Sequence, residues 1–211
     1  MPEIAAGEHS LEEGDQLVLL NAFDVMHKDP NCKLDIFSVD TDVFVLLVGH
    51  DPLIPKSTTL LRRKGERISI RESYLRLGHK RAEAFIDWYA FKGTNNTGSF
   101  AGKGTISNFK AFLQADDDIL NAFAAFGLTS ELPNWILDQM QWYLWLLYGS
   151  GVICECTVTE LRWALFGQKG KEGQQLPPTL GTLIPHTFRA YYMALVWKSS
   201  RKPCPKLPSP T

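Results

Sequence analysis

The sequence predicts an α/β fold in the first half of the chain and a wholly helical second half. Two short β-type segments, residues 58–61 and 67–70, flank Arg63-Lys64-Gly65-Glu66 and predict a hairpin. A buried strand is predicted over residues 34–39, where an apolar run leads into two aspartates. From residue 105 onward apolar residues recur at helical spacing. A length of 211 residues with 45% hydrophobic residues suits one globular domain with a sizeable core.

The N-terminal half is expected to open with a helix that ends near Lys28. Ser10 followed by Glu13 is a capping box, which begins such a helix, and Asp29-Pro30 ends it. After the strand at 34–39 comes an apolar run over residues 43–48. This run is too short and too uniform for its period to distinguish a strand from a helix.

The remaining elements are predicted from periodicity and from their ends. Gly78 should stop a short helix, since glycine readily adopts the conformation that ends helices. Phe85, Ile86 and Tyr89 lie on one face of the helix that follows. Helices are predicted over residues 71–77, 79–91, 105–113, 117–126, 132–148, 157–166 and 180–198. Residues 1–10 and the proline-rich tail at 201–211 are expected to be loose.

Charge is strongly segregated along the chain, although the net charge is only −1. Residues 1–42 hold ten acids against two bases, and residues 56–81 hold nine bases against two acids. This arrangement suits a metal site beside a track for a polyanion such as nucleic acid. The alternative is that both blocks are solvated faces.

Several classes of protein are not indicated. No apolar run has the length of a membrane span, and the N-terminus lacks the pattern of a signal peptide. The four cysteines are scattered, which favours a reducing compartment. We therefore expect an intracellular protein, in the nucleus or the cytoplasm, without a membrane partner; protein partners cannot be named from the sequence.

Two pairs of acidic residues are candidate metal ligands. Asp40 and Asp42 follow the predicted strand, and two carboxylates placed so closely favour a divalent cation between them. The alternative is that Asp40 caps the next segment while Asp42 is solvated. Glu13 and Asp15 lie in the first turns of the opening helix, where a favourable interaction with the helix dipole is the alternative explanation. The four together resemble the ligand set of a metal-dependent phosphodiesterase, with Mg²⁺ or Mn²⁺ as cofactor and Asp40 and Asp42 as catalytic residues.

Two further stretches are candidates for nucleic-acid binding. The loop over residues 93–104 is rich in glycine, so that Gly102 and Gly104 let the backbone approach a phosphodiester while Lys103 adds a charge. Its alternative is a plain connection between two helices. The basic turn formed by Arg62, Arg63 and Lys64 offers charges to flanking phosphates.

Five stretches of the chain follow a known family pattern in the same order. They are Glu12-Glu13-Gly14-Asp15, Ser38-Val39-Asp40-Thr41-Asp42, Gly98-Ser99-Phe100-Ala101-Gly102-Lys103-Gly104, Leu176-Pro177-Pro178-Thr179 and Leu207-Pro208-Ser209-Pro210. Through them the chain resembles a multicopy family of animal proteins, associated with mobile elements, that has a PIN-like core of the flap-endonuclease type. The resemblance implies a three-layer α/β core with a parallel sheet, over residues 11–128, followed by a helical region over residues 129–200.

The resemblance also implies site residues and a function. Glu13, Asp15, Asp40 and Asp42 match metal-binding acids, and Asn95 replaces a fifth acid, which removes a charge and lowers metal affinity. The family's N-terminal strand is not found upstream, so the chain is interpreted as a fragment or degenerate copy. The implied function is that of a metal-dependent 5′ flap endonuclease acting on DNA rather than RNA, with phosphodiester hydrolysis weak or lost. The alternative is a catalytically inactive PIN-like scaffold that acts by binding protein or nucleic acid.

Overall fold

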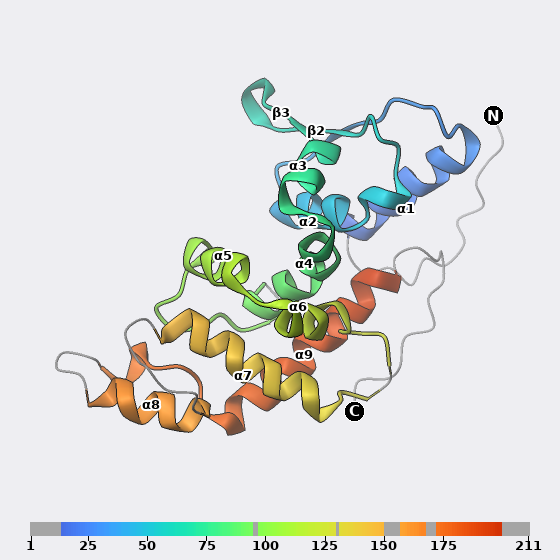
Figure 1. Cartoon of the computed structure of the whole chain (residues 1–211). Helices are drawn as coiled ribbons and strands as arrows, with labels where there is room; N and C mark the ends of the chain where they lie inside the picture. The colour runs from blue at the N-terminus through green and yellow to red at the C-terminus, as the bar shows by residue number, and fades with distance from the viewer. Residues whose placement is uncertain (1–13, 95–96, 130, 150–156, 168–171, 200–211) are drawn as a thin grey trace. The chain divides into compact units, whose positions relative to one another are not determined.

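The computed structural model describes residues 14–94, 97–129, 131–149, 157–167 and 172–199. These residues belong to two compact units. The first unit runs to Ala82 and resumes at Leu195, and the second runs from Glu83 to Ala194. The division passes within α4 (His79–Lys92) and within α9 (Leu180–Ser199), which are labelled in Figure 1. The boundary expected at residue 128 lies inside the second unit, between α6 (Asp117–Ala124) and α7 (Asn134–Tyr148).

The first unit combines a small sheet with three helices. In chain order its elements are α1 (Gly14–Lys28), β1 (Asp35–Phe37), α2 (Thr41–Gly49), the 3₁₀ turn η1 (Asp51–Leu53), β2 (Thr59–Leu61), the 3₁₀ turn η2 (Arg63–Gly65), β3 (Arg67–Ser69) and α3 (Ile70–Leu77). Helix α2 packs against both α1 and α3. Residues 1–13, including the predicted capping box at Ser10 and Glu13, lie outside the described residues.

The sheet has the order β1-β2-β3 and mixes two directions. β1 pairs with β2 in parallel, with Ile36 opposite Leu60, whereas β2 and β3 are antiparallel, with Leu60 opposite Ile68. The predicted hairpin is thus confirmed, and so is the α/β class of this half. The expectation of a parallel sheet holds for one pair of strands only. The three-residue turn η2 is the reason, since a parallel pair needs a crossover of about a dozen residues.

The apolar run at 43–48 proves to be helical and forms most of α2. Asp40 is the N-cap, and its Oδ1 accepts a hydrogen bond of 3.0 Å from the backbone N–H of Asp42. The side chains of Val43 and of residues 45–48 are all buried. Because the helix is covered on nearly every side, its sequence lacks the polar face from which a helical period is read.

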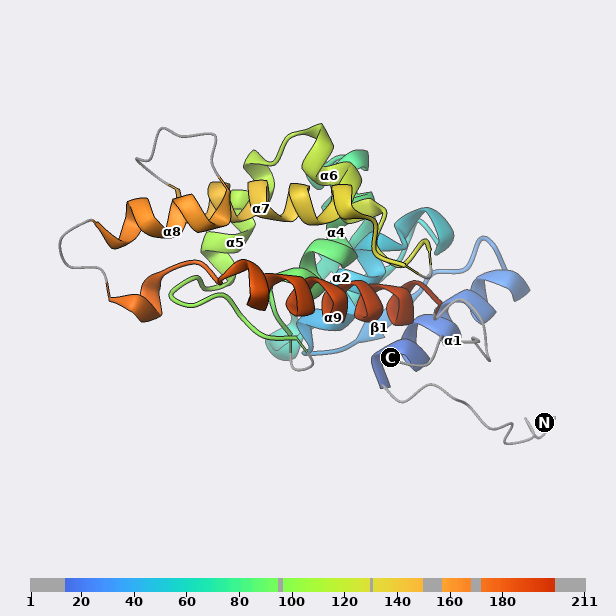
Figure 2. The same cartoon turned by 90° about the horizontal axis from the view of Figure 1, so that it is seen from below.

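The second unit is helical throughout its described residues. Besides most of α4 (His79–Lys92) and α9 (Leu180–Ser199), it contains α5 (Thr105–Gln114), α6 (Asp117–Ala124), α7 (Asn134–Tyr148), α8 (Val158–Phe166) and the 3₁₀ turn η3 (Gly173–Gln175). The predicted helices are confirmed, with ends that differ by at most two residues. Helix α7 packs against α5, α6 and α8 (Figure 2).

An aromatic core holds the second unit together around α7. Phe91, Phe112 and Phe123 are fully buried beside Trp88 and Tyr143. The Tyr143 hydroxyl accepts a hydrogen bond of 2.8 Å from Trp88 Nε1 and donates one of 3.0 Å to the backbone carbonyl of Asn108. Burial raises the pKa of Tyr143. Each polar atom of this aromatic pair therefore has the partner that burial requires.

None of the helices in the described part of the chain has the length and apolar character needed to cross a bilayer.

Candidate metal centre

Three of the carboxylates named from the sequence converge in the first unit. Asp15, Asp40 and Asp42 each offer one carboxylate oxygen, and these oxygens all lie within 4.8 Å of one another. Asp15 lies in the first turn of α1, Asp40 is the N-cap of α2, and Asp42 lies in the first turn of α2. The cluster therefore forms where the N-termini of two packed helices meet.

Local hydrogen bonds fix the backbone of the aspartate turn. Asp40 has extended backbone angles, its N–H donates to Ser38 Oγ at 3.1 Å, and its Oδ1 caps α2 through the N–H of Asp42. The capping role foreseen as an alternative for Asp40 is thus present. Capping occupies one carboxylate oxygen of Asp40, so it does not exclude a second role for the same side chain.

The helix ends reduce the repulsion within the cluster. The three carboxylates carry about three negative charges in total, whereas each helix N-terminus supplies only about half a positive charge. Asp40 is exposed, and Asp15 and Asp42 are half-buried, so solvent and hydrated ions can reach all three. The cluster could therefore hold a cation.

The donor set fits a hard divalent cation. Carboxylate oxygens are the ligands that Mg²⁺, Mn²⁺ and Ca²⁺ prefer. Two oxygens on opposite sides of Mg²⁺ lie about 4.2 Å apart, since each bond is about 2.1 Å long. Oxygens at the 4.8 Å limit would have to approach by about half an ångström, which a small side-chain rotation provides. The larger Ca²⁺, with bonds of about 2.4 Å, spans such a separation directly.

The other sequence-predicted residues fall elsewhere. Glu13 and Asn95 lie outside the described residues. Gly102, Lys103 and Gly104 belong to the second unit, whereas the three carboxylates belong to the first.

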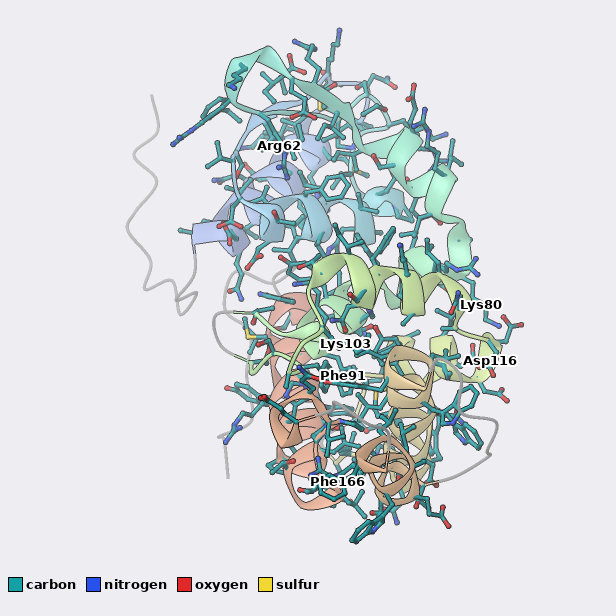
Figure 3. The ribbon with its side chains drawn as sticks, turned by 90° about the vertical axis from the view of Figure 1, so that its left-hand side faces the viewer. Arg62, Lys80, Phe91, Lys103, Asp116 and Phe166 are labelled. Atoms are coloured by element: carbon teal, nitrogen blue, oxygen red, sulfur yellow. The ribbon has the colours of Figure 1, made fainter. Side chains whose placement is uncertain are left out.

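The predicted basic turn forms η2, at the tip of the β2–β3 hairpin in the first unit. Arg63 and Lys64 are exposed there, and Lys64 adopts a positive φ of 66°. Arg62 is half-buried instead, and its Nε is enclosed without a hydrogen-bond partner (Figure 3). The charge offered to an anion at this turn therefore comes mainly from Arg63 and Lys64.

Several other bases of the segment 56–81 are engaged in ion pairs. Arg67 Nη2 lies 3.0 Å from Asp35 Oδ2, and Arg76 Nη2 lies 3.9 Å from Glu72 Oε2. Arg71 Nη1 lies 2.5 Å from Oδ2 of Asp51, whose side chain is 1% exposed. None of these pairs was predicted from the sequence, and the last of them is the most buried. Acid and base lie 20 residues apart, and no local pattern joins them.

The glycine-rich loop is held from within the second unit. Lys103 Nζ lies 4.8 Å from the centre of the Tyr148 ring, and the Tyr148 hydroxyl donates a hydrogen bond of 2.9 Å to the carbonyl of Ala101. Burial raises the pKa of Tyr148 to about 12. Gly104 is the N-cap of α5 and makes no side-chain cap, so the first N–H groups of α5 lack that partner. The Lys103 ammonium thus has an aromatic contact that the sequence pattern did not reveal.

His186 also anchors this loop. Its Nε2 donates a hydrogen bond of 2.8 Å to the carbonyl of Phe91, because a carbonyl can only accept. Its ring packs 5.1 Å from the ring of Phe91 and 4.8 Å from that of Phe100. Burial lowers the pKa of His186, although the hydrogen bond to Phe91 opposes the shift. A neutral His186 therefore joins α9 to the end of α4 and to Phe100 within the loop.

Comparison of the chain with models of protein families, with curated proteins and with solved structures finds no match.

Proposed function

We propose that this chain is a nuclease-like domain whose carboxylate cluster binds Mg²⁺ or Mn²⁺ and which contacts nucleic acid, with weak or lost phosphodiester hydrolysis. In this proposal the first unit derives from a PIN-like core of the flap-endonuclease type. DNA is the expected partner. The observation that carries the proposal is the convergence of Asp15, Asp40 and Asp42, which the sequence named as ligands from two separate segments.

Each group has a distinct role in this proposal. Asp15, Asp40 and Asp42 would hold the cation. A divalent cation held by these carboxylates would supply polarisation of the phosphodiester and activation of water. Arg63 and Lys64 would contact backbone phosphates as exposed point charges, which position a strand without reading its sequence. Asn95, in place of a fifth acid, reduces the negative charge available to a metal, which supports weak rather than strong hydrolysis.

Metal binding can be separated from helix capping by the variant Asp40→Asn. Asparagine caps helices about as well as aspartate. Without divalent metal, the free energy of unfolding of the variant should therefore lie within about 1 kcal/mol of the wild-type value. With Mn²⁺ at about one hundred times its dissociation constant, the wild type should gain about 2.7 kcal/mol. The variant loses an anionic ligand, and we expect its Mn²⁺ affinity to fall at least about tenfold. Thermal unfolding in EDTA and across a Mn²⁺ titration measures both quantities.

Asp118→Asn is the matched control. Like Asp40, Asp118 is an exposed acid near the N-terminus of a helix, here in the first turn of α6, and it lies outside the cluster. Its variant should keep the wild-type response to Mn²⁺. An equal response of Asp40→Asn and wild type to Mn²⁺ would show that the three carboxylates serve only the helix ends.

The nuclease assignment is tested on labelled 5′ flap and single-stranded DNA with Mn²⁺. We expect slow cleavage that requires the metal and disappears in the double variant Asp40→Ala/Asp42→Ala. Cleavage that persists in this variant contradicts the proposed active site. If Mn²⁺ stabilises the protein but no DNA is cut, the catalytically inactive scaffold is the better description, and binding of the same DNAs then becomes the relevant measurement.

A further inference from the structure

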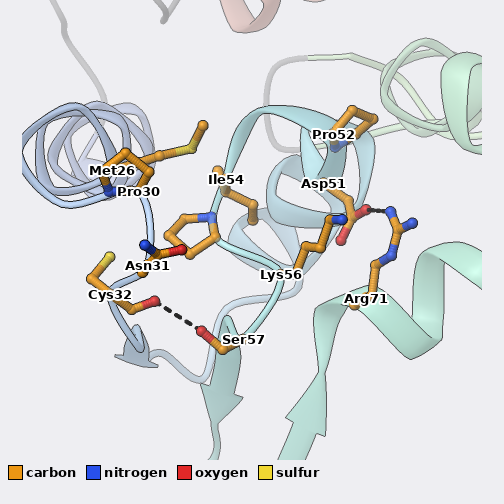
Figure 4. Close-up of a pocket in the computed structure, with 11 residues that line it drawn as sticks. Met26, Pro30, Asn31, Cys32, Asp51, Pro52, Ile54, Lys56, Ser57 and Arg71 are labelled. Atoms are coloured by element: carbon orange, nitrogen blue, oxygen red, sulfur yellow. Dashed lines mark hydrogen bonds and ion pairs between the residues drawn. The ribbon is translucent and has the colours of Figure 1, made fainter.

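A cavity of about 400 Å³ lies in the first unit, apart from the residues of the carboxylate cluster (Figure 4). Its apolar lining comes from Met26, Pro30, Pro52, Ile54 and Pro55. The volume is within the range of about 300–1,000 Å³ that is usual for small-molecule sites, which combine an apolar lining with a few placed polar groups. The cavity is therefore large enough for a ligand of some size and not merely for a few waters.

Two basic side chains, Lys56 and Arg71, lie in the lining of this cavity beside the neutral polar residues Asn31 and Ser57. Figure 4 shows Lys56 extending toward the Asp51–Arg71 pair, with Met26, Pro30 and Cys32 on the opposite side. Lys56 is exposed and forms no ion pair with any residue that the structure describes. The single acid of the lining, Asp51, has a side chain that is 1% exposed and is directed to Arg71, so the lining carries a net charge of +1.

Arg71 is held in place before any ligand arrives. Its Nη1 is bound to Asp51 Oδ2 at 2.5 Å, and its guanidinium carbon lies 5.3 Å from the centre of the Tyr74 ring. Among the described residues, none accepts a hydrogen bond from its Nε or Nη2. A guanidinium fixed on two sides loses little entropy on binding, and its remaining N–H groups match the oxygens of a carboxylate or a phosphate.

We propose that this cavity binds a small organic anion, whose carboxylate or phosphate group contacts Arg71 and Lys56 and whose apolar body lies against the apolar lining. The proposal does not depend on the nuclease-like function, since the cavity shares no residue with the carboxylate cluster.

Cys32 provides a reporter inside the cavity. It is a free, half-buried cysteine of the lining, and a ligand in the cavity should shield its sulfur from a small alkylating reagent. Iodoacetamide is suitable because it is neutral: the thiolate sulfur displaces iodide, a carbon–sulfur bond forms, and the thiol proton passes to solvent. The rate of modification is followed by mass spectrometry of the peptide that contains Cys32.

Phenyl phosphate is the anionic probe, and benzyl alcohol, of similar size but neutral, is its control. We expect millimolar phenyl phosphate to slow alkylation of Cys32 at least threefold, and benzyl alcohol at the same concentration to leave the rate unchanged. In Lys56→Gln the phenyl phosphate concentration for half-protection should rise about tenfold, the effect of one lost charge-assisted hydrogen bond. In Lys33→Gln it should remain at the wild-type value, since Lys33 follows Cys32 in the chain but does not line the cavity.

Lys56 is exposed and free of ion pairs with described residues, so its variant tests the site without the risk of unfolding that Arg71 variants carry. Equal protection by both probes would overturn the anion site, as would undiminished protection of Lys56→Gln by phenyl phosphate. Absence of protection by phenyl phosphate in the wild type would overturn the cavity as a binding site.

Discussion

Replacing Arg71 by methionine is expected to lower the free energy of unfolding by about 3 kcal/mol. The loss comes from the acid that remains behind. Asp51 has a side chain that is 1% exposed, and its Oδ1 is already buried without a hydrogen-bond partner. Without Arg71, both oxygens of Asp51 would be enclosed with no cation at Oδ2, and burying an unpaired carboxylate is strongly unfavourable. Urea denaturation followed by far-ultraviolet circular dichroism measures the change.

Arg67→Met is the matched control for this prediction. Arg67 also pairs with an aspartate, Asp35, at 3.0 Å, but the two side chains are 55% and 40% exposed. Exposed pairs of this kind contribute about 0–1 kcal/mol, because water solvates either partner when the other is removed. If Arg71→Met and Arg67→Met prove equally stable, Asp51 must reach water in solution and the pair is not buried in the sense described.

The double variant Arg71→Met/Asp51→Leu separates the ion pair from the packing around it. Replacing both partners of a buried pair with apolar side chains of similar volume is often neutral, whereas removing one is not. We therefore expect the double variant to recover most of the stability lost in Arg71→Met. The free energy of unfolding that the double variant regains measures the penalty of burying the unpaired Asp51 carboxylate.

The sequence was most informative where the physical cause is local. A turn of Arg63-Lys64-Gly65-Glu66 between two β-type segments predicted the hairpin, and Gly78 ends α3 with a positive φ of 85° as expected. In each case the residues that decide the structure lie within a few positions of one another.

Prediction was weaker where burial or distance along the chain removes the local signal. The run at 43–48 gave no period because α2 is buried on nearly all sides, although Asp40 as an N-cap pointed to a helix. The partners of Arg71 and of Lys103 lie 20 and 45 positions away, at Asp51 and Tyr148, and only the folded chain brings them together.

The candidate site was predictable in part: its acids could be named from local sequence, but their convergence could not. The acids were recognisable from their positions at a helix start and after a strand, and from the resemblance to a family pattern. The packing of α1 against α2 brings Asp15 close to Asp40 and Asp42. No local sequence pattern encodes this packing. The same helix ends also explain why an acid is favourable at each position without a metal. Metal-dependent stability, rather than the mere presence of the acids, is therefore the decisive measurement.

The glycine-rich loop makes the second large prediction: Gly93→Ala should destabilise the second unit by about 3 kcal/mol or more. Gly93 has a φ of +111°, which side chains with a Cβ rarely adopt. A Cβ at this position would also lie 2.7 Å from the carbonyl oxygen of Gly98 and 2.8 Å from Cα of Ser99. Both contacts are with backbone, so no side chain can rotate away, and Gly93 would have to move apart from Gly98 and Ser99.

Gly102→Ala, in the same loop, isolates the clash from the backbone strain. Gly102 also has a positive φ, of 67°, but a Cβ there would meet no atom within 4 Å. We expect this variant to lose only about 1–2 kcal/mol, the usual penalty for a left-handed residue with a Cβ. Hydrogen exchange at the amides of α4 and α5, compared among the two variants and the wild type, measures the difference. Similar exchange in both variants would mean that Gly93 is required only for its backbone angle. Faster exchange in Gly93→Ala alone would mean that the loop depends on the close approach of Gly93 to Gly98 and Ser99.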